Sequence, residues 1–93
     1  RYAHIDMLKI DIEGAETKVL INITAQLNKV DNIFVEYHSI IGEEQTINTI
    51  MDILIHAGFR IYCESSVRGD HPFIDEQLCN GFDSQINIWG KRA

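Results

Sequence analysis

The sequence has 93 residues, of which 45% are hydrophobic and 24% charged, a balance that is typical of one small globular domain and excludes wholesale disorder. The formal net charge is −6 and the 8 Lys and Arg residues are scattered, which argues against a nucleic-acid partner because phosphate binding needs clustered basic side chains. No apolar run is long enough to span a membrane and no signal peptide is visible, so we expect a cytoplasmic protein whose cysteines, Cys63 and Cys79, are reduced.

The first predicted element is a strand from Ile5 to Glu13. Its nearly continuous apolar character is typical of a strand that is covered on both faces. Gly14 then permits a sharp turn into a helix that we expect to run to about Lys29. Apolar residues recur along that helix at helical spacing, namely Ala15, Val19, Ile23, Leu27 and Val30.

A β-branched and aromatic run, 33–38, predicts a second strand. Because a helix separates it from the first strand, the two strands should be parallel and joined by a right-handed crossover. Glu43 and Glu44 suit the start of a second helix, for which Gly58 is a suitable C-terminal cap.

The last part of the chain predicts two more strands, at 59–64 and 85–91. With no helix between them they should pair antiparallel. Residues 65–84 show no clear period and predict a long loop. The element order is therefore β-α-β-α-β-β, with two parallel strands and a terminal antiparallel pair, which is an α/β class.

The segment Leu8-Lys9-Ile10-Asp11-Ile12-Glu13-Gly14-Ala15-Glu16, followed by Val19-Leu20, resembles the signature of the FkbM family of S-adenosylmethionine-dependent methyltransferases. The run Phe34-Val35-Glu36-Tyr37-His38 resembles that family's next strand. The resemblance implies the C-terminal half of a Rossmann-like methyltransferase fold, with residues 1–93 as part of a catalytic domain. The chain starts at Arg1 rather than Met, which fits a piece of a longer protein.

Methyl transfer to a hydroxyl often needs a general base within hydrogen-bond reach of its proton. Ligands of such sheets bind outside the carboxyl ends of the strands, where this chain has Asp11 and Glu13 after one strand and Glu36 and His38 in the next. Neighbouring strands lie about 5 Å apart, so these groups could reach one crevice. We expect Asp11, Glu36 and His38 to be catalytic, and Glu13 and Glu16 to bind substrate.

Each candidate also has a structural alternative. Asp11 could bond loop amides, Glu13 could cap the helix, and Glu16 could be a solvated partner of the helix dipole. Glu36 needs a partner if it is buried, and His38 could be structural. Mixed carboxylates would suit Mg²⁺, but their spacing does not single out a site, and we expect no metal.

The six glycines lie too far apart for a glycine-rich cofactor motif, so the S-adenosylmethionine site should lie mostly outside this chain. The first hypothesis is therefore the acceptor-side half of a methyltransferase that acts on a hydroxyl of a sugar, glycan or secondary metabolite, and this half alone should be inactive. The alternative is a non-catalytic α/β interaction module. The unpaired side of the first strand would let either one form a homodimer.

Overall fold

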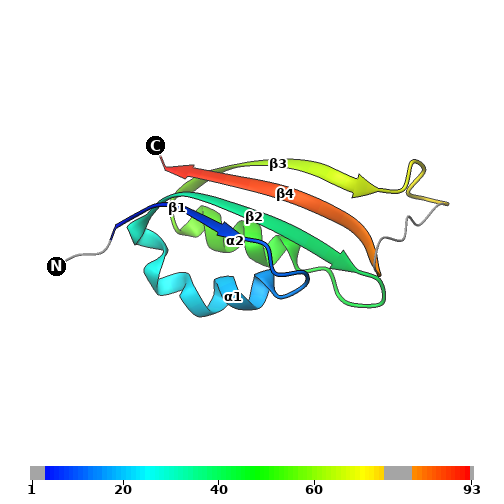
Figure 1. Cartoon of the computed structure of the whole chain (residues 1–93), viewed down its shortest axis with the longest axis horizontal. Helices are drawn as coiled ribbons and strands as arrows, with labels where there is room; N and C mark the ends of the chain where they lie inside the picture. The colour runs from blue at the N-terminus through cyan, green and yellow to red at the C-terminus, as the bar shows by residue number, and fades with distance from the viewer. Residues whose placement is uncertain (1–3, 75–80, 93) are drawn as a thin grey trace.

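The computed structural model describes residues 4–74 and 81–92, with only the backbone of residue 67. These residues form a four-stranded sheet with helices packed beneath it (Figure 1). In chain order the elements are β1 (Ile5–Ile10), α1 (Glu16–Ile23), the 3₁₀ helix η1 (Thr24–Lys29), β2 (Val30–Ile40), α2 (Ile47–His56), β3 (Phe59–Arg68) and β4 (Phe82–Arg92). The mixed α/β class that the sequence predicted is confirmed.

The strand order in the sheet is β1-β2-β4-β3. Strands β1 and β2 are parallel, with Leu8 opposite Ile33 and Ile10 opposite Val35, as the intervening helix predicted. Strand β4 pairs antiparallel with both β2 and β3, so the expected terminal antiparallel pair is also confirmed. The predicted loop at 65–84 is wrong at both ends, because β3 continues to Arg68 and β4 begins at Phe82. The middle of that loop, 75–80, lies outside the described residues.

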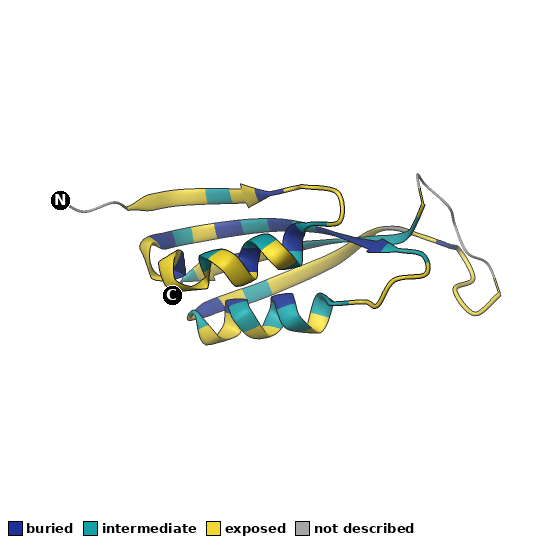
Figure 2. Cartoon of the chain, turned by 90° about the horizontal axis from the view of Figure 1, so that it is seen from below, coloured by how far each residue is buried: buried dark blue, intermediate teal, exposed yellow. Residues whose placement is uncertain are grey.

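The expectation that the first strand is covered on both faces is wrong. All described helices pack on the same face of the sheet (Figure 2), and β1 is an edge strand. Ile5 is 39% exposed and Met7 54% exposed as a result. The strand also ends at Ile10 rather than Glu13, because the chain there leaves β2 and enters a turn in which Glu13 has a φ of 34°. Among the described residues, the outer side of β1 pairs with no strand, as predicted.

Both helices differ from their predicted limits at one end. The first helix becomes 3₁₀ after Ile23, where the Thr24 hydroxyl donates back to the Leu20 carbonyl at 2.8 Å. The second begins at Ile47 and not at Glu43, since the Thr46 backbone N–H donates to the Tyr37 hydroxyl and anchors the chain before the first turn. Its predicted end is confirmed, with Gly58 at a φ of 97°. Neither described α-helix has the length and hydropathy that a membrane span requires.

The core lies between the sheet and the helices and is mostly aliphatic. Leu20 of α1, with Ile50 and Leu54 of α2, is fully buried. On the sheet side the buried core residues include Ile10, Ile33, Val35, Tyr37 and Ile88. The packing of one apolar helix face on one apolar sheet face explains why the other sheet face carries different side chains.

Arg92, at the end of β4, closes the far end of the core. Its guanidinium donates to the carbonyls of Leu27, Val30 and Ala57, and it stacks over the Phe59 ring at 4.3 Å. These carbonyls end η1, start β2 and follow α2, so one side chain joins three elements. The positive charge is well placed at two helix C-termini.

On the helix-free face the side chains form two rows across the strands. One row is apolar and aromatic: Phe34 and Trp89 are opposite each other, with ring centroids 5.4 Å apart, and the Lys9 ammonium lies 5.8 Å from the Phe34 ring. Tyr62 follows Trp89 in register. The adjacent row is polar, with Glu36 opposite Asn87. This polar row ends at the candidate site.

Candidate functional site

The centre of the candidate site is a buried pair, Glu16 and His38, from the first turn of α1 and the carboxyl-terminal part of β2. Glu16 is 1% exposed and His38 6% exposed. The His38 ring nitrogen Nδ1 lies 2.9 Å from Glu16 Oε2, and the His38 backbone N–H donates to Glu16 Oε1 at 3.3 Å. The Phe82 ring packs on the imidazole, with centroids 4.8 Å apart. The pair therefore holds the imidazole ring in one orientation.

The turn after β1 explains how Glu16 reaches this position. Gly14 has a φ of 104°, which folds the chain back so that α1 begins beside the end of β2. The backbone N–H groups of Ile12 and Gly14 then donate to Glu16 Oε2 at 3.2 and 3.0 Å. Glu16 thus caps its own turn, and with the two His38 contacts its carboxylate accepts four hydrogen bonds.

This network determines which ring nitrogen of a neutral His38 carries the proton. All other bonds of Glu16 use its oxygens as acceptors, so Nδ1 is the donor to Glu16. The lone pair is then on Nε2, which lies 3.9 Å from Asp11 Oδ1, beyond hydrogen-bond distance. The imidazole presents a proton acceptor, or a metal ligand, on the side away from Glu16.

Asp11 and Glu36 lie on that side. One ligand atom from each of Asp11, Glu36 and His38 falls within 4.8 Å of the other two. Burial raises the pKa of Glu36, and the hydrogen bond and negative charge of Asp11 raise it further, against smaller opposing effects of His38 and Lys9. The Gln85 side-chain amide of β4 donates to Glu36 Oε2. Asn87, opposite Glu36 on β4, has a buried Oδ1 that has no hydrogen-bond partner among the described residues.

The structure brings together four of the five side chains singled out from the sequence, because Asp11, Glu36 and His38 form one cluster and Glu16 is bonded to His38. Glu13 is exposed and lies outside the Asp11–Glu36–His38 cluster. Its expected capping role is wrong, because no side chain caps α1 at Ala15 and Glu16 takes the turn amides. The alternative of Glu16 as a solvated charge is also wrong, since it is buried. Whether Glu13 and Glu16 contact substrate stays a prediction.

Sequence reasoning missed the partnership of Glu16 with His38, and the contributions of Gln85 and Phe82. The signal for the first was present: an acid two residues after the glycine of a strand-to-helix turn can point back at the end of the next parallel strand. The β4 residues carried no such signal, because the pairing of β4 with β2 does not follow from their positions in the chain.

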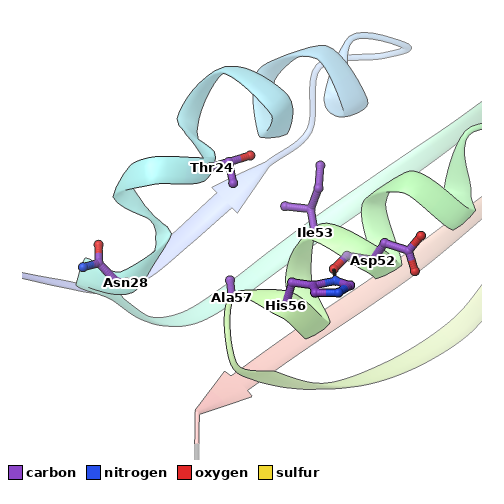
Figure 3. A pocket seen from close by; sticks show the side chains of 6 residues that line it. All are labelled: Thr24, Asn28, Asp52, Ile53, His56 and Ala57. Atoms are coloured by element: carbon purple, nitrogen blue, oxygen red, sulfur yellow. Dashed lines mark hydrogen bonds between the residues drawn. The ribbon is translucent and has the colours of Figure 1, made fainter.

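Two hollows in the surface differ in whether candidate residues line them. A cavity of about 130 Å³ lies beside the site, lined by His38, Gly14, Tyr37, Ile40, Glu43, Glu44 and Thr46. A groove of about 440 Å³ lies between the two helical segments (Figure 3), lined by Thr24, Asn28, Asp52, Ile53, His56 and Ala57. His56 is exposed in that groove, where its Nδ1 bonds the Asp52 carbonyl of its own helix. The groove contains none of the candidate residues.

Comparisons with known proteins are informative for one part of the chain. A family model described as the methyltransferase FkbM domain matches residues 2–61 of the 93. That range includes β1, α1, β2 and α2, and with them Asp11, Glu16, Glu36 and His38. The comparison with curated proteins and the comparison with solved structures each gave no match.

Proposed function

The chain belongs to the FkbM methyltransferase domain family, and from this premise we propose that it is the acceptor-side half of an S-adenosylmethionine-dependent methyltransferase with a Rossmann-like fold. The parallel pair β1–β2 with a helical crossover and the antiparallel pair β3–β4 support this fold. The acceptor we propose is a hydroxyl of a sugar, glycan or secondary metabolite, which rests on the family resemblance.

The observation that carries the proposal is the convergence of Asp11, Glu36 and His38, which come from the end of β1 and the carboxyl-terminal half of β2. A hydroxyl that receives a methyl group must lose its proton, and this cluster offers carboxylate and imidazole acceptors at one point. Glu16 is buried and bonded to the His38 ring, so we assign it to holding that ring in place. Glu13, exposed at the same edge, remains the candidate for substrate contact.

The candidate site does not by itself fit the methyl donor. The glycines are dispersed, and the cavity beside His38, about 130 Å³, is smaller than the roughly 300–1,000 Å³ of typical small-molecule sites. We therefore propose no role in donor binding for the residues of this site. Their part is to position the acceptor and to take its proton.

The test is calorimetric titration of S-adenosylhomocysteine into two proteins, this chain and the chain with the coding sequence that precedes Arg1. Binding only to the longer protein is expected. In that protein, His38→Ala and Asp11→Asn should abolish methyl transfer to a hydroxyl acceptor without weakening S-adenosylhomocysteine binding. Binding to neither protein would contradict the proposal.

The edge position of β1 favours one other candidate function, a non-catalytic interaction module that dimerises through this strand. In the part of the chain that the structure describes, the outer side of β1 has no partner strand, and β1 carries the exposed Ile5 and Met7. Sedimentation velocity over a concentration series should then detect a dimer, and Ile5→Lys should dissociate it by placing a charge on the edge. A monomer at all concentrations would exclude this candidate.

A further inference from the structure

We propose that Asp11, Glu36 and His38 form a binding site for a divalent cation of the Mg²⁺ and Mn²⁺ class. The three side chains come from the end of β1 and from β2, and their ligand atoms lie within 4.8 Å of one another. Adjacent ligands of an octahedral ion with bonds of about 2.1 Å lie roughly 3 Å apart. Asp11, whose side chain is 39% exposed, has the freedom to close that gap.

His38 makes this cluster more than a pair of neighbouring acids. Its side chain is 5% exposed, and its Nε2 faces Asp11 Oδ1 at 3.9 Å without a hydrogen bond to it. Histidines that bind metals commonly donate their second ring N–H to a carboxylate, which fixes the tautomer and directs the free nitrogen at the ion. Glu16 supplies that carboxylate at 2.9 Å, itself held by the turn amides. The ligand nitrogen is therefore oriented before any ion arrives.

A second cluster, His4, Asp6 and Asp31, has the same ligand types and provides a contrast. Its His4 is 39% exposed, and the Nε2 atom is already engaged by Asp31 Oδ2 at 2.7 Å. Asp6 is 92% exposed, so water competes fully for its carboxylate. We do not propose an ion there, and the cluster serves as the matched control.

The donor set determines the class of ion. The two carboxylates favour Mg²⁺ and Mn²⁺, and the imidazole favours the transition-metal ion Mn²⁺ of these two. An ion would also neutralise the two acids that now lie against each other, and Asn87 Oδ1, opposite Glu36, needs a donor or a positive charge nearby.

This inference rests on side-chain geometry and stands apart from the proposed methyl transfer. If both hold, the ion would bind the acceptor oxygen and lower the pKa of its hydroxyl, which is a common role of metal ions in catalysis. Asp11, Glu36 and His38 would then act on the acceptor through the ion rather than as direct bases.

The experiment is a titration of the 93-residue chain with MnCl₂, in which the loss of the electron paramagnetic resonance signal of free Mn²⁺ measures binding. One ion per chain is expected. Asp11→Asn and His38→Ala should each weaken binding at least tenfold, and Glu16→Gln by about 10–100-fold through loss of the carboxylate behind the imidazole. His4→Ala should bind Mn²⁺ as the wild type does.

Thermal melts separate a lost site from a lost fold. Mn²⁺ should raise the Tm of the wild type and of His4→Ala, but not that of Asp11→Asn, whose melt without metal should remain cooperative because Asp11 is exposed. Absence of Mn²⁺ binding up to millimolar concentration, or binding that is lost in His4→Ala and kept in His38→Ala, would overturn the inference. Methyl transfer that depends on His38 yet is unaffected by EDTA would also overturn it, while the proposed function would survive.

Discussion

The Glu16 carboxylate and His38, 22 residues apart in the sequence, are joined by two hydrogen bonds: Oε2 with the ring Nδ1 at 2.9 Å and Oε1 with the backbone N–H at 3.3 Å. The pair links the first turn of α1 to β2 at the edge of the sheet where Asp11 also lies. The Glu16 carboxylate also accepts the N–H groups of the turn before α1. Removal of its charge would therefore affect the turn, the helix and the imidazole together.

Glu16→Gln should lower the free energy of unfolding by about 1–3 kcal/mol. The amide NH₂ cannot accept a hydrogen bond, so it would face N–H groups of Ile12, Gly14 or His38 and leave at least one of them unsatisfied. Urea denaturation followed by circular dichroism measures the change. Glu43→Gln, at an exposed position nearby, is the control and should be neutral. Equal stability of the two variants would show that the Glu16 network contributes nothing net.

Gly14→Ala should cost more stability than Gly42→Ala. Both glycines have positive φ, 104° and 87°, so alanine pays a similar backbone cost of about 1 kcal/mol at each. At Gly14 the added Cβ would also lie 2.6 Å from Ile40 Cδ1, whereas at Gly42 no atom of the described residues would lie within 4 Å of it. Ile40→Val, which removes that methyl group, should cancel the excess. The measurement is the difference in urea midpoint among Gly14→Ala, Gly42→Ala, Ile40→Val and the double variant Gly14→Ala with Ile40→Val, and no excess at Gly14 would contradict the reasoning.

Arg92→Met should destabilise the protein by about 2–4 kcal/mol, because it removes the guanidinium donors of the Leu27, Val30 and Ala57 carbonyls while keeping much of the apolar stem. The Leu27 carbonyl keeps the Val30 backbone N–H as a second donor. Lys91→Met is the matched control, since Lys91 is the exposed neighbour on the same strand. Thermal unfolding at constant pH measures both. A Tm for Arg92→Met equal to that of the control would mean that water hydrogen-bonds these carbonyls as well as the guanidinium does, with no loss of stability.

Alkylation of Cys63 should show a pH midpoint above that of the same thiol in unfolded protein. Burial raises the pKa of this cysteine on β3, and only the thiolate reacts. The rate with iodoacetamide would be measured across pH in a Cys79→Ser background, folded and in urea. In the folded protein the rise in rate should come at higher pH. A midpoint at or below that of the unfolded thiol would contradict the expected desolvation.

The parallel arrangement of β1 and β2 followed from the helical spacing between two apolar runs, and it alone predicts that Asp11, Glu36 and His38 converge at one edge. The exposure of β1 could not be predicted from the spacing of its apolar residues. Its apolar run is typical of a strand covered on both faces, yet Met7 is exposed because both helices lie on one side of the sheet. The role of Glu16 depends on a turn with left-handed backbone at Glu13 and Gly14, whose direction a pattern of residue types does not specify.

The strand order β1-β2-β4-β3 has a consequence for how the molecule assembles as it leaves the ribosome. Strand β4 is synthesised after every element it joins, yet it occupies an interior position between β2 and β3. Until it arrives, β2 lacks one of its two neighbours, and β3 has no partner among the described strands. The nascent chain should therefore remain open and dependent on chaperones until Phe82–Arg92 has emerged, and then close in one late, cooperative step.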